Sequence, residues 1–281
     1  MKIRSLASLV TVAALLSVTP STRAALMPGY VEVDDIHADI ALPYIATSGL
    51  WQPFVHTGVV NYAGNYAPNM ALLMVNESTL TTRPANGVNN FDFIGVAAGE
   101  PIYLLSANPV PGQLYLGVEA DYGLTSPERM LTSNATNYKS WDPDADVSGP
   151  TGTSRYVELS VKAVRGPGYF SVYDFSLGFG GVRAQVASAD GLDGKDEWHQ
   201  IPRSHSHYNW AFTEPGYYEI DIQARTLLGP DSGSGTQVMS NVETFHFQVV
   251  PEPSTALFGA IGVAALALRR HRRRPLHACL S

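Results

Sequence analysis

Short stretches of two-residue apolar alternation constrain the fold of this chain more than any other feature. Three of them are VELSVKAV (157–164), YYEIDIQA (217–224) and TFHFQVV (244–250). In the first, the pattern places Val161 and Ala163 on one face. No long stretch between residues 25 and 250 has the 3.6-residue apolar period of a helix. Because successive side chains of a strand point to opposite faces, the pattern predicts strands with one buried face.

Turn-forming residues separate these stretches. Gly, Pro, Asn and Asp gather in segments such as RGPG, DGLDG and LGPDSGSG. Further strands are predicted at residues 101–106, 114–120 and 169–175. Many short strands with such turns are typical of an antiparallel β-sandwich. We therefore interpret residues 25–250 as one all-β domain.

The first 24 residues have the pattern of a secretory signal peptide. A basic start precedes an apolar segment, Leu6–Val18, and Thr22 and Ala24 fit the small-residue positions before a cleavage site. We expect signal peptidase to cleave near Ala24, so that the chain is exported. The alternative is a retained anchor, for which the apolar segment is short.

The C-terminal segment combines three features in order: Pro251, Glu252 and Pro253, an apolar run at Thr255–Leu268, and five arginines between residues 269 and 274. A helix over the apolar run is about 21 Å long, shorter than the roughly 30 Å core of a bilayer. Arginines that follow a membrane segment favour the cytoplasmic side. The run is therefore predicted to form a short, weakly inserted transmembrane helix.

This order of features resembles the PEP-CTERM sorting signal of Gram-negative bacteria, over residues 251–274. The resemblance implies recognition by an exosortase and cleavage after transient anchoring in the inner membrane. It also implies a place at the cell surface or in the extracellular matrix, with extracellular polysaccharide as a possible partner. A simple tail anchor is the alternative.

Charge and cysteine content exclude several classes of function. Residues 25–250 hold 10 Lys and Arg against 24 Asp and Glu. This acidic body would repel phosphates, so nucleic acid is not expected as a partner. The single cysteine, Cys279, lies near the C-terminus. The body therefore has neither a disulfide framework nor a thiolate metal site.

Two pairs of potential metal ligands occur in predicted strands. His37 and Asp39 alternate with apolar residues, and His205 and His207 form a His-x-His pair. Each pair points to one face of an extended chain, and four N and O ligands suffice for zinc or another divalent metal. The alternative is a polar strand face whose histidines form hydrogen bonds. The sequence does not show whether the pairs meet.

Several short motifs are spread over residues 30–250: His37–Asp39, Gly166–Phe170, Ala189–Asp193, His205–His207, Asn209–Phe212 and Pro215–Gly216. In this order they resemble the choice-of-anchor M domain of bacterial surface proteins. The resemblance implies a surface-exposed β domain and supplies no enzymatic activity.

Two acidic loops are candidates for calcium. Asp142, Asp144 and Asp146 alternate in one loop, and residues 189–197 hold four carboxylates in a Gly-rich segment. The first departs from the EF-hand pattern because Val147 stands where Gly is required. Solvated turns are the alternative for both loops.

Motifs for nucleophilic or metalloprotease catalysis do not occur in the sequence. The leading hypothesis is therefore a non-enzymatic surface protein with a structural or binding role. A sharper variant of this hypothesis is a metal-binding module that uses His37, Asp39, His205 and His207. The rival hypothesis is a secreted hydrolase that acts on polysaccharide. Such an enzyme requires two carboxylates about 5–10 Å apart in an open cleft.

Overall fold

The computed structural model describes residues 29–45, 48–57, 64–120, 156–176, 181–201, 205–229 and 235–251. These residues form β-strands and short 3₁₀ helices, with no α-helix among them, so the predicted all-β class is confirmed. None of the segments in these ranges forms a helix long and apolar enough to cross a membrane. The predicted signal peptide (1–24) and C-terminal helix (255–268) lie outside the described residues.

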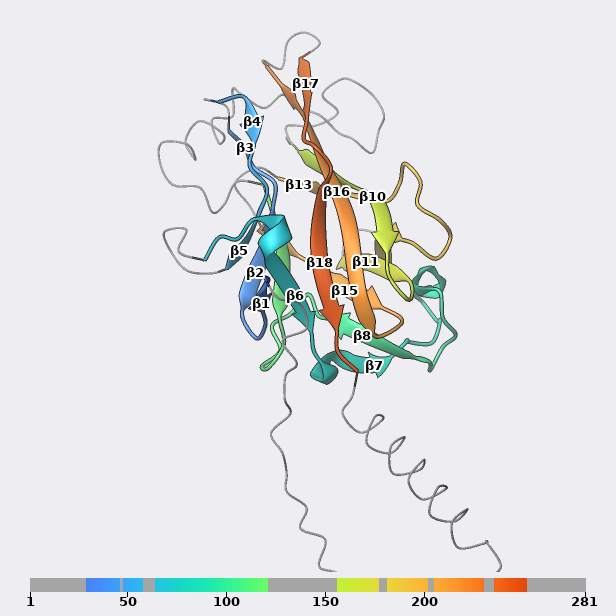
Figure 1. Ribbon diagram of the computed structural model, residues 1–281. Helices are drawn as coiled ribbons and strands as arrows, with labels where there is room; N and C mark the ends of the chain where they lie inside the picture. The colour runs from blue at the N-terminus through green and yellow to red at the C-terminus, as the bar shows by residue number, and fades with distance from the viewer. Residues whose placement is uncertain are drawn as a thin grey trace, which may run out of the picture.

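Two larger sheets make up most of the molecule (Figure 1). The seven-stranded sheet has the order β1 (Val31–Val33), β6 (Ala71–Val75), β18 (Glu243–Val249), β16 (Gly216–Leu228), β10 (Val157–Arg165) and β13 (Glu197–Gln200), and β17 (Thr236–Met239) pairs with β16. The five-stranded sheet has the order β12 (Gly181–Ala187), β11 (Phe170–Ser176), β15 (Asn209–Phe212), β8 (Pro101–Leu105) and β7 (Leu80–Thr82).

A four-stranded sheet lies beside them. Its order is β14 (His205–His207), β9 (Tyr115–Glu119), β2 (His37–Ala41) and β5 (Phe54–Thr57). A two-stranded sheet joins β3 (Tyr44–Ile45) to β4 (Leu50–Trp51). The 3₁₀ helices are η1 (Pro68–Met70), η2 (Glu77–Thr79) and η3 (Asp92–Ile94).

The predicted antiparallel arrangement holds only in part, because two of the sheets are mixed. β6 pairs in parallel with both β1 and β18, and β2 pairs in parallel with β9. Parallel neighbours need a connection of about a dozen residues or more, and each of these pairs is separated by far more. Alternation within single strands carries no information about such long-range pairing.

Aromatic side chains join the seven-stranded and five-stranded sheets. Phe247 of β18 contacts Phe170, Trp210 and Phe212 of the five-stranded sheet, with ring centroids 5.4 to 6.5 Å apart. All four side chains are fully buried. One core cluster continues into the four-stranded sheet through Ile40 and Val118. The core therefore fixes the inner face of all three sheets.

A β-bulge in β10 changes the predicted alternation of that strand. Val161 pairs with Ile222, but the register shifts before Ala163, which pairs with Asp221. Val164 therefore packs against the core in place of Ala163. The prediction that Ala163 shares the face of Val161 was wrong for this reason.

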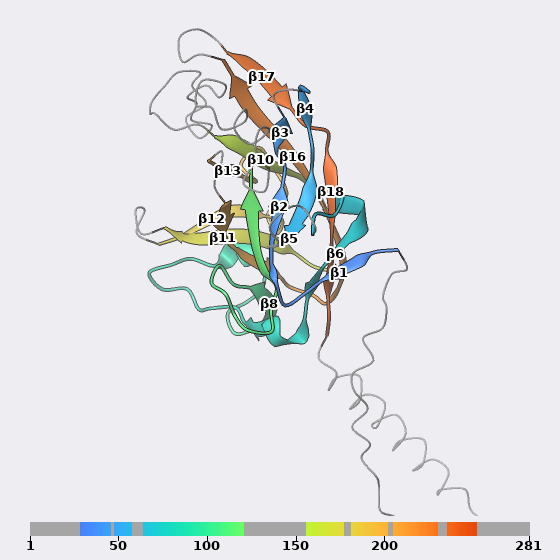
Figure 2. The same ribbon diagram turned by 90° about the vertical axis from the view of Figure 1, so that its left-hand side faces the viewer.

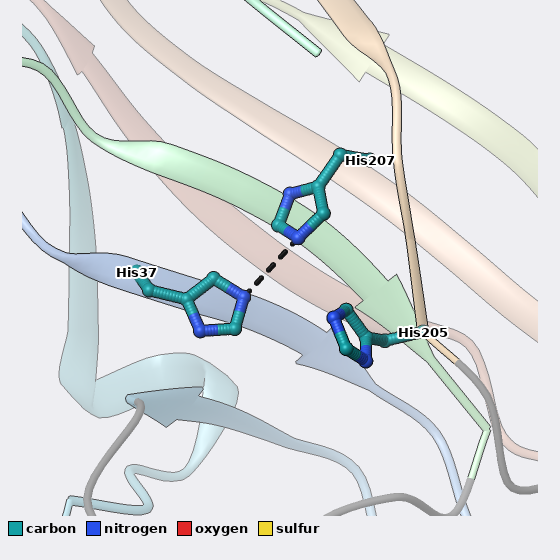
Figure 3. A group of neighbouring side chains, drawn as sticks. All are labelled: His37, His205 and His207. Atoms are coloured by element: carbon teal, nitrogen blue, oxygen red, sulfur yellow. Dashed lines mark hydrogen bonds between the residues drawn. The ribbon is translucent and has the colours of Figure 1, made fainter. Parts of the chain in front are cut away.

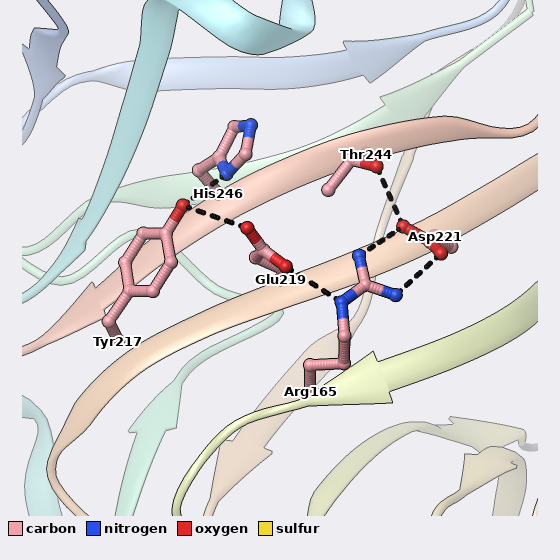
Figure 4. A network of polar contacts seen from close by, with 6 residues as sticks. All are labelled: Arg165, Tyr217, Glu219, Asp221, Thr244 and His246. Atoms are coloured by element: carbon pink, nitrogen blue, oxygen red, sulfur yellow. Dashed lines mark hydrogen bonds and ion pairs between the residues drawn. The ribbon is translucent and has the colours of Figure 1, made fainter.

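The outer face of the seven-stranded sheet carries a polar network over β10, β16 and β18 (Figure 4). Arg165 donates to Asp221 at 2.7 and 2.8 Å and to Glu219 at 2.7 Å. The Tyr217 hydroxyl lies 2.5 Å from His246 Nδ1. These contacts join the neighbouring strands β10, β16 and β18.

Candidate metal centre

The two faces of the four-stranded sheet have opposite chemistry. Ala38, Ile40, Leu116 and Val118 point into the core and are fully buried. The intervening residues of β2 and β9, together with their partners on β5 and β14, form the other face. That face carries six titratable side chains besides a tyrosine: His37, Asp39, His56, Glu119, His205 and His207. Figure 2 shows β2 and β5 side by side with the green strand of residues 115–119.

Strand register brings the two predicted ligand pairs to one place. On β9, Gly117 is paired with Asp39 on one side and with His207 on the other. The neighbouring pairs are His37 with Tyr115 and His205 with Glu119. Residues some 170 positions apart in the sequence therefore meet across a single central strand.

Three imidazoles converge above this strand (Figure 3). His37, His205 and His207 each offer a ligand nitrogen, and these atoms all lie within 4.8 Å of one another. His37 Nε2 is 3.2 Å from His207 Nε2. His205 approaches both rings, with centroids 5.5 and 5.4 Å from those of His37 and His207.

Two of the atomic separations fit the edges of a tetrahedron around one ion. Ligand atoms at about 2.0–2.1 Å from a tetrahedral zinc lie about 3.3–3.4 Å apart. The His37 Nε2 to His207 Nε2 distance is 3.2 Å, and His37 Nε2 to Asp39 Oδ2 is 3.4 Å. The ligand nitrogen of His205 lies within 4.8 Å of the other two nitrogens.

Asp39 lies beneath the histidines. Its side chain is fully buried, and neither carboxylate oxygen accepts a hydrogen bond from the described residues. Its closest polar contact is with His37, and it does not share the mutual 4.8 Å spacing of the three histidines. A buried carboxylate without donors is costly unless a cation or a proton neutralises it. A metal ion above Asp39 would meet that need.

Gly117 makes the approach of Asp39 and His207 possible. A Cβ atom at this position would lie 2.1 Å from Asp39 Oδ1 and 2.9 Å from His207 Cε1. Any side chain would therefore displace both residues. A glycine inside a strand often marks such a close approach.

Burial sets the protonation of the site. It raises the pKa of Asp39 to about 7. It lowers the pKa of His207 to about 4, with a smaller contribution from the other two histidines and an opposing one from the Leu116 carbonyl. The pKa of His37 is also lowered, by burial first and then by His205 and His56. His37 and His207 are therefore neutral at pH 7, as metal binding requires.

Neighbouring side chains hold the ligands in place. The Tyr115 ring stacks on His207, with centroids 3.6 Å apart and planes 7° from parallel. His56, opposite Asp39 on β5, places Nδ1 2.6 Å from Asn65 Oδ1. Such contacts fix ring orientation and tune a metal site.

A second cluster of potential ligands lies on the outer face of the seven-stranded sheet. Glu158, Glu197 and His199 offer atoms within 4.8 Å of one another. The ligand oxygens of the two carboxylates are thus closer together than the about 5–10 Å that the hydrolase hypothesis requires. Arg225, however, donates to both oxygens of Glu158, and Ser160 donates to one of them. These contacts hold Glu158 as an ion-paired carboxylate.

In the acidic loop at residues 189–197, the carboxylate of Asp196 accepts hydrogen bonds from the backbone near it. Asp196 accepts hydrogen bonds from the backbone N–H groups of Ala187 and Asp193, at 2.7 and 2.6 Å. This is the arrangement of a hydrogen-bonded turn. The loop of Asp142, Asp144 and Asp146 lies outside the described residues.

The sequence patterns missed the contribution of β9. Tyr115, Gly117 and Glu119 alternate along a strand that was predicted, so their common face could have been derived. The central position of that strand could not, because it depends on one parallel and one antiparallel pairing with distant segments.

Comparison with known proteins identifies the C-terminal segment. The PEP-CTERM protein-sorting motif matches residues 249–274. The chain carries an exosortase sorting signal. This motif indicates an exported protein that is sorted to the cell surface and processed by an exosortase. No curated protein and no solved structure matches the chain.

Proposed function

We propose that the protein is a non-enzymatic, metal-binding surface module whose ion is held by His37, His205 and His207, with Asp39 as the fourth ligand. The convergence of three histidines above a buried carboxylate carries this proposal. Zinc is the ion that suits this set best, because imidazole and carboxylate in a tetrahedral arrangement are common zinc ligands.

The ligand set favours a structural or storage role over catalysis. Four protein ligands around zinc leave no position for a substrate, whereas catalytic zinc sites keep one position open. Asp39 is fully buried, so it would approach the ion from the protein side. We therefore expect the ion to stabilise the four-stranded sheet.

The sorting motif supports a location outside the cell for this module. We further propose that the body belongs with choice-of-anchor M domains, a hypothesis that rests on the sequence segments alone. Binding to extracellular polysaccharide is part of the same proposal.

The experiment is a calorimetric titration of zinc into the metal-free protein, prepared without a histidine tag. We expect about one zinc per chain. Each of His37→Ala, His205→Ala and His207→Ala should weaken binding by at least about 100-fold, more than the loss of an outer-shell partner. Asp39→Asn should weaken it less, since an amide oxygen is a poorer, neutral ligand.

The matched control is His246→Gln, which removes an imidazole from the polar network of the seven-stranded sheet. Its zinc affinity should equal that of the wild type. Equal losses in His246→Gln and His207→Ala, or no zinc binding by the wild type, would contradict the proposal.

A further inference from the structure

A pocket on the outer face of the seven-stranded sheet lies apart from the three histidines. It has a volume of about 260 Å³ and is formed by β10, β13, β16, β17 and the loop that contains Asp193. Strand pairing sets its floor in two rows. Arg225 and Glu158 form one row, and Gln223, Ser160 and Glu197 form the other.

The floor of the pocket is held rigidly. Glu158 is 2% exposed although it is charged. Arg225 donates to both of its oxygens and Ser160 donates to one at 3.1 Å. Gln223 is fixed in turn by a hydrogen bond to the Ser240 carbonyl at 2.9 Å. A ligand would therefore find these groups already ordered, which lowers the entropy lost on binding.

The charges of the lining nearly balance. Glu158, Asp193 and Glu197 are acidic, while Lys162 and Arg225 are basic. A divalent cation at Glu158 would lie against the Arg225 guanidinium, and an anion would lie against the carboxylates. The lining therefore suits neither a metal ion nor a phosphate.

Donors and acceptors alternate across the same surface. Carboxylates accept hydrogen bonds, the guanidinium and ammonium donate them, and Gln223 and Gln237 do both. A sugar hydroxyl also donates and accepts at once. The volume is below the about 300–1,000 Å³ of pockets for drug-sized ligands, so it suits a single ring. From this geometry we propose that the pocket binds one neutral hexose unit of a polysaccharide, an inference that rests on the polysaccharide binding proposed above.

The test is saturation-transfer NMR of the purified protein with neutral trisaccharides of glucose, mannose, galactose and N-acetylglucosamine. At least one should bind, with a dissociation constant on the order of 1 mM for a single ring. Glu197→Gln and Gln237→Ala should each weaken binding by about 10-fold, because the first replaces an acceptor oxygen by a donor and the second removes the amide. Affinity should be nearly constant with salt, since the ligand is uncharged.

Gln248→Ala is the matched control, because it removes an amide from β18 of the same sheet outside the pocket. It should bind the sugar like the wild type, and thermal unfolding should show that all variants fold. Three results would overturn the proposal: no binding of any trisaccharide, equal binding by the wild type and both pocket variants, or competition by Mn²⁺ or inorganic phosphate. Zinc removal should leave sugar binding unchanged, so this test is independent of the three-histidine site.

Discussion

Gly117 is the residue on which the approach of His207 to Asp39 depends most. In Gly117→Ala, the new methyl group would overlap Asp39 Oδ1 and press on His207. We expect a loss of about 1–3 kcal/mol in the free energy of unfolding, as for other overpacked sites. Zinc affinity should fall by more than about 10-fold, since small displacements of ligands weaken a metal site. Chemical denaturation and zinc titration measure the two effects.

Gly87→Ala is the control for that substitution. A Cβ at Gly87 would meet no atom within 4 Å. Stability and zinc affinity should therefore stay within error of the wild type. If Gly117→Ala behaved in the same way, the close approach over β9 would be without consequence and our account of the site would fail.

The buried Asp39 should leave a signature in the pH dependence of stability. Its pKa rises from 3.8 to about 7 in the folded chain, so folding binds a proton between these values and stability falls as pH rises. His207 has the opposite effect on the pH dependence. Its pKa falls from 6.5 to about 4 on folding, so between these values the unfolded chain binds more protons than the folded chain and stability rises with pH. In the metal-free protein the two contributions partly cancel.

The Asp39→Asn variant lacks only the contribution of Asp39 to the pH dependence of stability. Relative to the wild type, the free energy of unfolding of the variant should rise with pH between about 4 and 7, by up to about 1.4 kcal/mol per pH unit. Urea denaturation with a chelator present, at several pH values in this range, measures the difference. Parallel pH profiles for the two proteins would show that Asp39 titrates normally.

At the scale of elements, the sequence predicts strands well and their neighbours poorly. Alternation placed β2, β9, β10, β16 and β18 close to their observed positions, because each has one face in the core. It could not place β9 between β2 and β14, nor β6 between β1 and β18. Such pairings join segments that are distant in the chain. The His-x-Asp and His-x-His pairs were therefore recognisable as ligands, while their meeting point was not.

Two arginines whose ion pairs link neighbouring strands should differ in their effect on stability. Arg165 is 48% exposed and pairs with Asp221 and Glu219, whereas Arg225 pairs with Glu158, whose side chain is 3% exposed. Arg165→Gln should cost less than about 1 kcal/mol, as for surface pairs. Arg225→Gln should cost about 2–4 kcal/mol, because it leaves a buried carboxylate unpaired. Urea denaturation compares the two variants, and equal costs would contradict this interpretation.

At the scale of the whole molecule, the sorting motif begins inside the folded sheet. Val249 of β18 pairs with Gly216 and Val75, and the Val250 N–H donates to the Val75 carbonyl at 2.9 Å. The matched motif starts at residue 249, so Pro251 follows the sheet without a spacer. A folded body therefore lies directly beside the segment that the exosortase recognises.

A spacer at this junction should speed processing. We expect about six Gly and Ser residues, inserted between Val250 and Pro251, to add up to roughly 20 Å of reach and to shorten the half-life of the unprocessed chain in pulse-chase labelling. Thermal unfolding should be unchanged. The same insertion after Gly229, between β16 and β17, is the control and should leave processing as it was. Slower or equal processing with the spacer at the junction would contradict the expectation.

The most direct test of the central claim is the metal content of the untagged protein and of its His205→Ala/His207→Ala variant, determined by mass spectrometry after dialysis. Three converging imidazoles over a buried carboxylate predict about one zinc per chain in the wild type and none in the variant. A wild type that retains no stoichiometric metal, or a variant that retains as much as the wild type, would contradict the claim and leave the histidines as a polar strand face.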